Sequence, residues 1–186
     1  MSRRAATSLP PLTLVIDTRE PLASAYDFAS ICPTPPVRKK LDVGDYSILG
    51  HEHAIAWERK DLGDLFSTII SNRARFEREI ARAATLTRFT ILVEGTVRDV
   101  LGYWASEAAK EHWKDRWGAP LSDDNRKARC RSVLNSLNTW TVEHGIFILF
   151  VDRDRAMCRA MVYRQAERYW RQVHTSPAAA PSNILP

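Results

Sequence analysis

The stretch from Leu41 to Asp64 constrains the fold more than any other part of the chain. It contains two apolar-rich runs, Leu41–Leu49 and Ala54–Lys60, separated by the four polar turn residues Gly50-His51-Glu52-His53. Two such runs with so short a connection are typical of antiparallel strands joined in a hairpin. The stretch therefore predicts a β-hairpin near the middle of the first half of the chain.

The length of the turn determines which residues face each other across the hairpin. With four residues in the loop, Leu49 pairs with Ala54, and counting back along both strands brings Asp45 opposite Glu58. Directly opposed residues of an antiparallel pair share one face of the sheet, with Cβ atoms about 5 Å apart. We therefore expect these two carboxylates to lie side by side.

Alternation along the second strand adds a cation to this pair of acids. Glu58 and Lys60 share one face, whereas Trp57 and Arg59 point to the other. Two carboxylates and an ammonium at one place are costly unless a cation is added or function requires them. Two acids can hold a hard divalent ion through oxygen, and a lysine can orient an attacking water. A Glu-Arg-Lys triplet alone is usually a solvated strand end, but the opposed Asp45 favours a site that cuts phosphodiesters.

The first apolar run of the chain supplies further charged residues. Leu12–Asp17 is compact and rich in β-branched residues, which predicts a buried strand. Asp17, Arg19 and Glu20 stand at its end, where α/β sheets expose functional groups. Asp17 could ligate a metal or hold a water near Asp45. Arg19 and Glu20 could orient the site or simply pair with each other.

The same residues resemble a known family. The pattern Gly44-Asp45, then Glu58-Arg59-Lys60, then Asp64 after three further residues is similar to the GD…ERKxxxD signature of the XPF-family nuclease domain. That domain is a branch of the restriction-enzyme-like PD-(D/E)xK superfamily. The segment Val15–Glu20 resembles the family's first strand with its DxRE ending, and Ile91–Gly95 resembles its next core strand. Several motifs in the family's order make this a specific resemblance.

The resemblance implies a mechanism and a set of roles. Asp45 and Glu58, with the backbone carbonyl after Glu58, would hold one Mg²⁺ or Mn²⁺, and Asp17 would support a second ion or its water shell. Lys60 would position the attacking water, Arg59 would brace the site, and hydrolysis would leave 3′-hydroxyl and 5′-phosphate ends. The signature also gives Asp64 a supporting role. Four basic residues are candidates for DNA contacts: Arg73, Arg75, Lys39 and Lys40.

The remaining periodicities complete an α/β domain with a mixed, restriction-endonuclease-like sheet of about five strands flanked by helices. A helix is expected to begin at Asp61 as N-cap and to kink near Ser71-Asn72. The continuously apolar run Ile146–Asp152 predicts a strand covered on both faces. The expected strands are Leu12–Asp17, Leu41–Leu49, Ala54–Lys60, Arg88–Glu94 and Ile146–Asp152; the other expected helices are Thr96–Leu101, Asn125–His144 and Arg153–Val173.

The expected domain covers residues 12–174, between a disordered arm, 1–11, and a disordered tail, 175–186. Within it, residues 103–124 are an expected insertion, in which Trp104, Trp113 and Trp117 are interleaved with lysines and arginines. Such a pattern can stack and clamp nucleic acid. Tryptophans packed on the core are the commoner outcome.

Composition indicates the kind of partner and the cellular environment but does not identify the function. The net charge of +5 suits an anionic partner but is weak support by itself. The three cysteines are isolated, which argues against a disulfide framework, and no apolar run approaches the ~18 residues of a membrane span. The expectation is a soluble, cytoplasmic, DNA-associated protein.

These features predict a metal-dependent DNA endonuclease, structure-specific for flap, fork or branched DNA in repair or recombination. The resemblance also implies a homodimer or heterodimer through the nuclease domain, with the last two helices as its surface. None of the seven glycines are spaced two apart, as the hairpins of the family's usual helix-hairpin-helix module require, which puts the branched-DNA preference in doubt. The rival hypothesis is a catalytically inert, nuclease-like DNA-binding or scaffolding partner, against which the retained acidic residues speak. A third is a relative that acts on RNA or in host defence.

Overall fold

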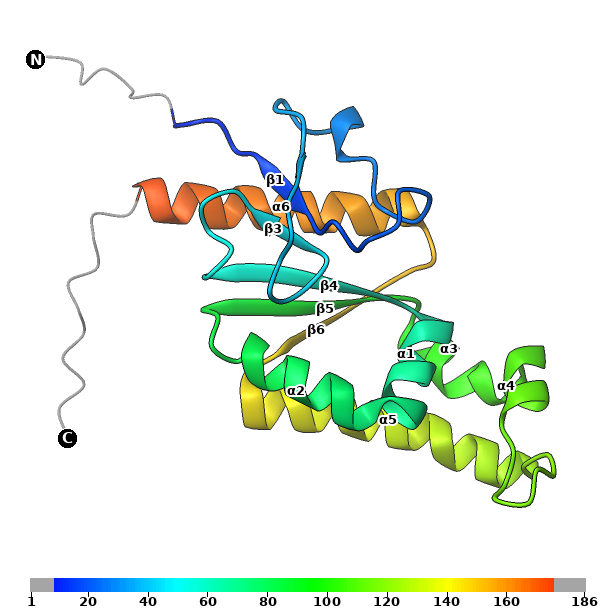
Figure 1. Cartoon of the computed structure of the whole chain (residues 1–186). Coiled ribbons are helices and arrows are strands. Elements are labelled where there is room, and N and C mark those ends of the chain that lie inside the picture. Colours follow the sequence, from blue (N-terminus) through cyan, green and yellow to red (C-terminus); the bar gives the residue numbers. More distant parts are fainter. Residues whose placement is uncertain (1–8, 176–186) are drawn as a thin grey trace, which may run out of the picture.

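A computed structural model describes residues 9–175, and a six-stranded mixed sheet runs through its centre (Figure 1). The strand order is β2-β1-β3-β4-β5-β6; β3 is antiparallel to β1 and β4, and the other neighbours are parallel. The strands are β1 (Leu14–Ile16), β2 (Val37–Arg38), β3 (Tyr46–Ile48), β4 (Ile55–Asp61), β5 (Arg88–Glu94) and β6 (Phe147–Val151). The expected α/β fold with a mixed sheet is confirmed.

Helices cover both faces of the sheet. Helix α6 packs on one face, while α1, η2, α2 and α5 pack on the other, with α3 and α4 at one end of this layer (Figure 1). The helical elements are η1 (Phe28–Ser30), α1 (Leu62–Phe66), η2 (Ser67–Ser71), α2 (Arg73–Ala83), α3 (Val97–Gly102), η3 (Tyr103–Ala105), α4 (Glu107–His112), α5 (Asp123–His144) and α6 (Arg155–Thr175). Of the described residues, none form a helix long and apolar enough to cross a membrane.

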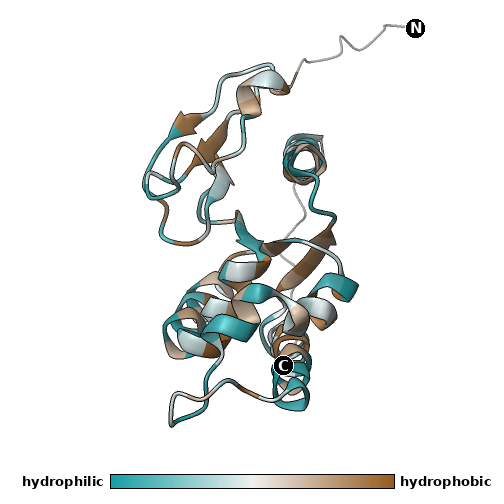
Figure 2. Cartoon of the chain, turned by 90° about the vertical axis from the view of Figure 1, so that its right-hand side faces the viewer, coloured by the Kyte–Doolittle hydropathy of each residue, from teal (hydrophilic) through white to brown (hydrophobic). Residues whose placement is uncertain are grey.

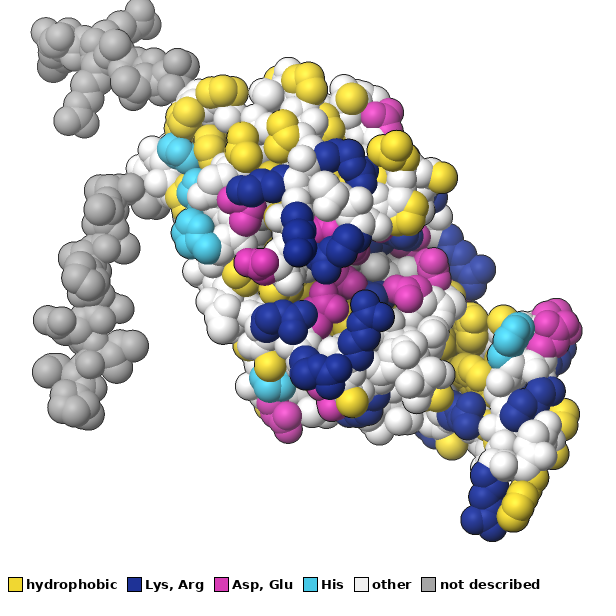
Figure 3. Space-filling model, viewed as in Figure 1, with side chains coloured by type: hydrophobic (Ala, Val, Ile, Leu, Met, Phe, Trp, Pro, Cys, Tyr) yellow, Lys and Arg dark blue, Asp and Glu magenta, His cyan; other side chains and the backbone are white. Residues whose placement is uncertain are grey.

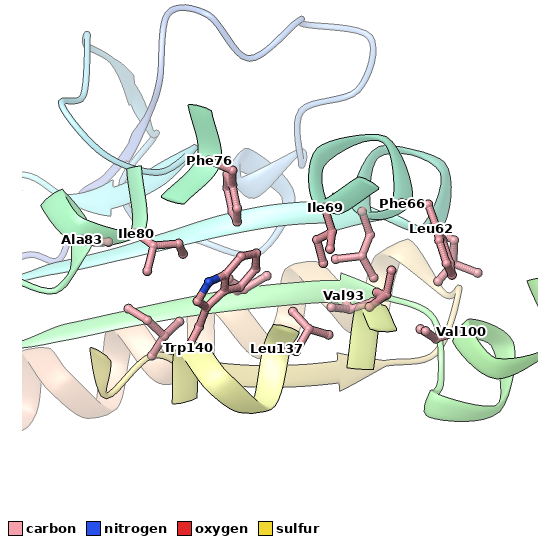
Figure 4. Close-up of a cluster of buried hydrophobic side chains, with 14 of the residues drawn as sticks. Leu62, Phe66, Ile69, Phe76, Ile80, Ala83, Val93, Val100, Leu137 and Trp140 are labelled. Carbon is pink, nitrogen blue, oxygen red and sulfur yellow. The ribbon is translucent and has the colours of Figure 1, made fainter. Parts of the chain in front are cut away.

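Two hydrophobic cores result, one on each side of the sheet. Neighbouring residues of β4 alternate between them: Ala56 contributes to the core beneath α2 and α5, and Trp57 to the core beneath α6. Figure 4 shows the first core, in which Phe76 and Ile80 of α2 lie near Trp140 of α5. Because both faces are covered, strand residues are buried in continuous runs, and Figure 2 shows several strands in brown, the hydrophobic end of its scale.

The hairpin has the register that its turn length predicts. Tyr46 pairs with Trp57 and Ser47 with Ala56, which is the register that brings Asp45 opposite Glu58. The first strand of the hairpin is shorter than the expected Leu41–Leu49, because β3 covers only Tyr46–Ile48. The preceding residues bend, and Gly44 adopts a positive φ of 78°.

The helical predictions after the hairpin are also confirmed. The Asp61 side chain caps α1 by accepting a hydrogen bond from the backbone N–H of Asp64 at 2.8 Å. The expected kink is a π-helical turn, η2, closed by the N–H of Asn72 donating to the carbonyl of Ser67. Helix α5 is capped by Ser122 and ends at Gly145, which takes the left-handed conformation.

The sheet has six strands where about five were expected, because residues 21–40 contribute the two-residue strand β2, which pairs with β1. Strand β6 contributes to both cores, with Ile148 and Phe150 on one face and Leu149 and Val151 on the other, but its cover is incomplete, because Phe147 at the edge of the sheet is 65% exposed.

The ends and the insertion segment also differ from expectation in part. The arm and tail expected at 1–11 and 175–186 lie mostly outside the described residues, although the Pro10 carbonyl accepts a 2.8 Å hydrogen bond from the Trp170 indole. Within residues 103–124, Trp113 is buried and Trp104 packs against the same core, as expected. Trp117, by contrast, is 78% exposed.

Helix α5 offers a matched test of the core. Leu137→Ala removes a side chain that is 2% exposed, and we expect it to lower the free energy of unfolding by about 2–5 kcal/mol. Val142→Ala on the same helix changes a side chain that is 84% exposed, and should alter it by less than about 0.5 kcal/mol. Urea denaturation of both variants checks the packing, and equal effects would contradict it.

Candidate active site

The acids and the lysine predicted from the hairpin meet in one cavity. Asp45, Glu58 and Lys60 line a hollow of about 250 Å³ between the sheet and the α1–α2 layer. In the space-filling view, magenta acidic side chains gather in a hollow near the centre of the face, between dark-blue basic ones (Figure 3). The complete lining is Arg19, Gly44, Asp45, Glu58, Lys60, Asp64, Thr68, Asn72, Arg75, Phe76 and Glu79.

Gly44 allows Asp45 to approach β4. A Cβ at position 44 would lie 2.9 Å from the carbonyl oxygen of Trp57, and the positive φ already disfavours other residues. The Asp45 N–H donates to that same carbonyl at 2.8 Å, and Asp45 Oδ2 accepts the Arg59 N–H at 2.8 Å. The Gly-Asp pair therefore holds one carboxylate against the strand that carries the other.

Lys60 lies between two carboxylates. Its Nζ is 2.8 Å from Glu58 Oε1 and 2.8 Å from Asp64 Oδ2, and it stands 4.9 Å above the ring of Phe76. Burial lowers the pKa of Lys60, but the charges of Glu58 and Asp64 outweigh it, so the pKa is raised. The amine is held as an ammonium, positioned to attract an anion or an attacking water.

The paired acids occupy surroundings that disfavour their negative charge. Burial raises the pKa of Asp45 to about 7, and burial with repulsion from Asp45 raises the pKa of Glu58 to about 8. Glu58 is 6% exposed, whereas Asp45 keeps part of its surface open to the cavity. A bound cation would relieve both the desolvation and the repulsion.

Glu79 is a cavity residue that the sequence motifs did not indicate. It enters from α2 together with Arg75, and Asn72 lies at the beginning of the same face. Residues 72, 75, 76 and 79 recur at helical spacing, so this periodicity was the available signal. The cavity therefore contains four carboxylates, including Asp64, with Arg19 and Arg75 on its wall.

Asp17 has a different place from the one expected of a metal ligand. Its Oδ1 accepts hydrogen bonds from the Arg19 N–H and Nε at 2.6 and 2.8 Å, and its Oδ2 accepts from Arg19 Nη2 and the Leu41 N–H at 3.0 and 2.6 Å. Burial raises the pKa of Asp17, but these hydrogen bonds outweigh it and the pKa is lowered. Asp17 is not among the lining residues. The geometry favours a role in holding Arg19 over the metal-binding role.

Arg59 lies on the opposite face of β4 from Glu58 and Lys60, as alternation along the strand requires. Its Nε is 3.1 Å from Glu20 Oε1 and its Nη1 is 3.2 Å from Glu94 Oε2. Glu20 thus pairs with Arg59, not with Arg19. This second network contains no residue that lines the cavity, and it ties β4 to β5 and to the loop after β1.

The four candidate DNA-contacting residues are dispersed. Arg75 lines the cavity, whereas Arg73 is engaged with Glu77 at 2.7 Å and with Ser136 at 2.8 Å. Lys39 is paired with Glu52 at 2.6 Å. Lys40 and Lys39 line a separate hollow.

Taken together, the mixed sheet and the strand that presents Glu58 and Lys60 beside Asp45 define an XPF-type nuclease domain. Comparison with family models bears this out: the chain belongs to the ERCC4 domain family, whose model matches residues 16–162. Comparison with curated proteins gave no match.

Two solved structures share the fold. XPF from Aeropyrum pernix superposes with a TM-score of 0.57 at 18% identity, over 87% of this chain and 68% of that chain. XPF from Aeropyrum pernix in complex with DNA gives a TM-score of 0.58 at 18% identity, over 90% and 68%. At this identity the likeness shows the fold alone.

The raised pKa values predict how the stability of the metal-free protein depends on pH. Because the folded-state pKa values of Asp45 and Glu58 lie above the ordinary values near 4, the folded protein holds more protons between about pH 4 and pH 8. These groups therefore lower the free energy of unfolding as the pH rises through that window. Asp45→Asn should raise the melting temperature at pH 8 by a few degrees, because each kcal/mol of added stability raises it by roughly 2–4 °C. At pH 4, where the wild-type carboxyl is already protonated, the change should be small.

Asp42→Asn is the matched control, since it removes an exposed carboxylate three residues away. Thermal unfolding in EDTA measures all three proteins. An Asp45→Asn variant no more stable than wild type at pH 8 would show that the two acids do not repel each other.

Proposed function

We propose that this protein is a metal-dependent DNA endonuclease that hydrolyses phosphodiester bonds in flap, fork or branched DNA, in repair or recombination. The observation that carries the proposal is the pair of carboxylates, half-buried Asp45 and buried Glu58, with Lys60 held 2.8 Å from Glu58 in the same cavity. Membership of the ERCC4 domain family supports it. The structural similarity to XPF from Aeropyrum pernix in complex with DNA supports nucleic acid as the partner.

The donor atoms suit a hard divalent cation. Among the described residues, no donor hydrogen-bonds to Asp45 Oδ1 or Glu58 Oε2, whereas the other oxygen of each is engaged. No three acidic, histidine or cysteine side chains of the described part gather closely enough to form a metal site alone. Mg²⁺ typically uses one or two carboxylates and fills its other positions with water and phosphate oxygens. Asp45, Glu58 and the Arg59 carbonyl would hold Mg²⁺ or Mn²⁺, which when bound would act as a Lewis acid on the phosphate.

Other residues at or near the cavity would position the water, the phosphate and the DNA backbone. Lys60 would orient the attacking water and attract the scissile phosphate. Arg19, from the loop after β1, and Arg75, from α2, both line the cavity and would contact backbone phosphates of the DNA. Asp64 would restrain Lys60, and Asp17 would hold the Arg19 guanidinium in place.

Cleavage assays test this assignment directly. Labelled flap, fork, single-stranded and duplex DNA are incubated with Mg²⁺ or Mn²⁺ and the wild-type chain, Asp45→Asn, Glu58→Gln or the control Asp42→Asn. We expect cutting that both site variants reduce about 100-fold or more, because a bound metal supplies several kcal/mol of charge stabilisation. Asp42→Asn should cut like the wild type, since Asp42 is exposed and does not line the cavity.

The same assay separates the proposal from its rival. Site variants that cut at the wild-type rate would place the chemistry elsewhere. A folded wild-type chain that binds the DNA but cuts none of it with either ion would instead indicate an inert, scaffolding member of the family.

A second chain is a further element of this proposal. The edge strand β6 leaves one side of the sheet unpaired, and its Phe147 is 65% exposed. Phe147 lines an apolar hollow with Leu134 and Phe150, and a second hollow with Met161 of α6. Such a patch on an open edge is typical of an association surface. We assign it to a homodimer or heterodimer with a chain of the same fold.

Phe147→Glu tests the association surface. A charge at the centre of the patch should convert a dimer of the purified chain into a monomer, as measured by sedimentation. Leu22→Glu changes a comparably exposed apolar residue elsewhere and should leave the assembly intact. Dimerisation that survives Phe147→Glu would exclude this surface, and a monomeric wild type would favour a heterodimer.

A further inference from the structure

A second cavity lies on the other side of the helical wall of the active site. It measures about 580 Å³, and its lining includes the aromatic side chains of Phe66, Tyr103 and Trp113 and the basic side chains of Lys114 and Arg129. None of these described lining residues is acidic, whereas the active-site cavity contains four carboxylates. The second cavity is therefore suited to an anion with flat, apolar parts.

The segment beyond α4 presents a tryptophan to solvent on a well-formed turn. Asp115 Oδ1 accepts the N–H groups of Trp117 and Ala119 at 2.8 and 2.9 Å, and Lys114 and Pro120 form a β-bridge that closes the turn. The indole of Trp117 nevertheless remains 78% exposed. A large apolar ring held outward by an ordered turn is a feature that core packing does not explain.

Cations accompany this ring. The Arg116 guanidinium lies 4.5 Å from the Trp117 ring centroid, and Arg129 lies 5.6 Å from that of Trp113. No ion pair joins Lys114, Arg116 or Arg129 to a carboxylate of the described residues, although Lys110 of the same region is paired with Glu107 at 2.7 Å. Figure 3 shows this region as a lobe at the lower right, with dark-blue and yellow side chains along it and magenta and cyan ones at its upper end.

The two cavities share one wall, formed by α1 and η2. Asp64, Thr68 and Asn72 face the active site, whereas their neighbours Gly63, Ser67 and Ser71 face the second cavity. A helix is about 10 Å across, a distance that roughly three stacked nucleotides span. A strand leaving the active site over this wall reaches the lobe directly.

We propose that this lobe, residues 103–121, binds the single-stranded arm of the DNA substrate. Trp117 stacks on a base, and Lys114, Arg116 and Arg129 contact phosphates, the combination by which proteins hold single strands without reading sequence. The inference rests on the proposed nuclease function for its choice of nucleic acid. The adjacency to a site for phosphodiesters favours DNA over an acidic peptide.

Binding measurements without divalent ions test the lobe independently of catalysis. Affinity for a labelled single-stranded oligothymidylate is measured by fluorescence anisotropy in EDTA. Trp117→Ala should weaken binding roughly 5- to 150-fold, the range for loss of one base–aromatic stack, and Trp117→Phe should recover most of the affinity. Leu22→Ala is the control and should bind like the wild type, because Leu22 is 80% exposed and lines neither cavity.

Two lysines of the lobe, one unpaired among the described residues and one in an ion pair, allow a second comparison. Lys114→Gln should reduce the dependence of log affinity on log salt by about 0.7, the slope for one phosphate contact on a single strand. Lys110→Gln should change it less, because Glu107 already neutralises Lys110. Unchanged affinity of Trp117→Ala, or equal competition by an oligoglutamate peptide, would overturn the inference.

Steady-state cleavage separates this inference from the proposed function. On a flap with a single-stranded arm, Trp117→Ala should raise KM and leave kcat unchanged, and on a nicked duplex without an arm it should change neither. Equal KM values of the wild type and Trp117→Ala on the flap would contradict single-strand binding by the lobe but not the proposed nuclease activity. If nothing is cut, the oligothymidylate measurements still decide whether the lobe binds single strands.

Discussion

Repulsion between two carboxylates, one buried and one half-buried, is the constraint on which the rest of this structure depends. Asp45 and Glu58 are brought together by the hairpin register. Neither can move away, because the Asp45 carboxylate is hydrogen-bonded to the backbone of β4 and Glu58 is itself a residue of β4. Lys60 offsets only part of their charge, since it is shared with Asp64. A site of this kind is stable only within a fold that holds it firmly, and the two cores above and below the sheet provide that support.

The central strand separates two ionic networks of different character. On one face, Glu58, Lys60 and Asp64 border a cavity open to solvent; on the other, Arg59 is held between Glu20 and Glu94. The second network is closed, with the Tyr26 hydroxyl donating to Glu94 at 2.6 Å. Adjacent residues of one motif thus have different surroundings: Arg59 ties β4 to β5 and to the loop after β1, whereas Glu58 and Lys60 border the open cavity.

The hairpin, the capped helix at Asp61 and the break before Asn72 could be predicted from the sequence, because each depends on residues close together in the chain. Strand β2 could not, since two residues carry no periodicity and pair only because β1 offers a free edge. The exposure of β6 was missed for a similar reason, because a sheet's outermost strand is decided by the order of all the others. Glu79 and the role of Asp17 depend on how a distant helix and loop pack against the hairpin.

The π-helical turn at Ser67–Ser71 determines which residues of α2 face the cavity. Each residue in a helix advances the face by about 100°, so the extra residue in this turn sets which side of α2 looks toward the sheet. Removing one residue there would keep every motif of the chain and yet turn Arg75 and Glu79 out of the cavity. The number of residues between the signature and α2 is therefore as much a part of the site as the identity of its acids.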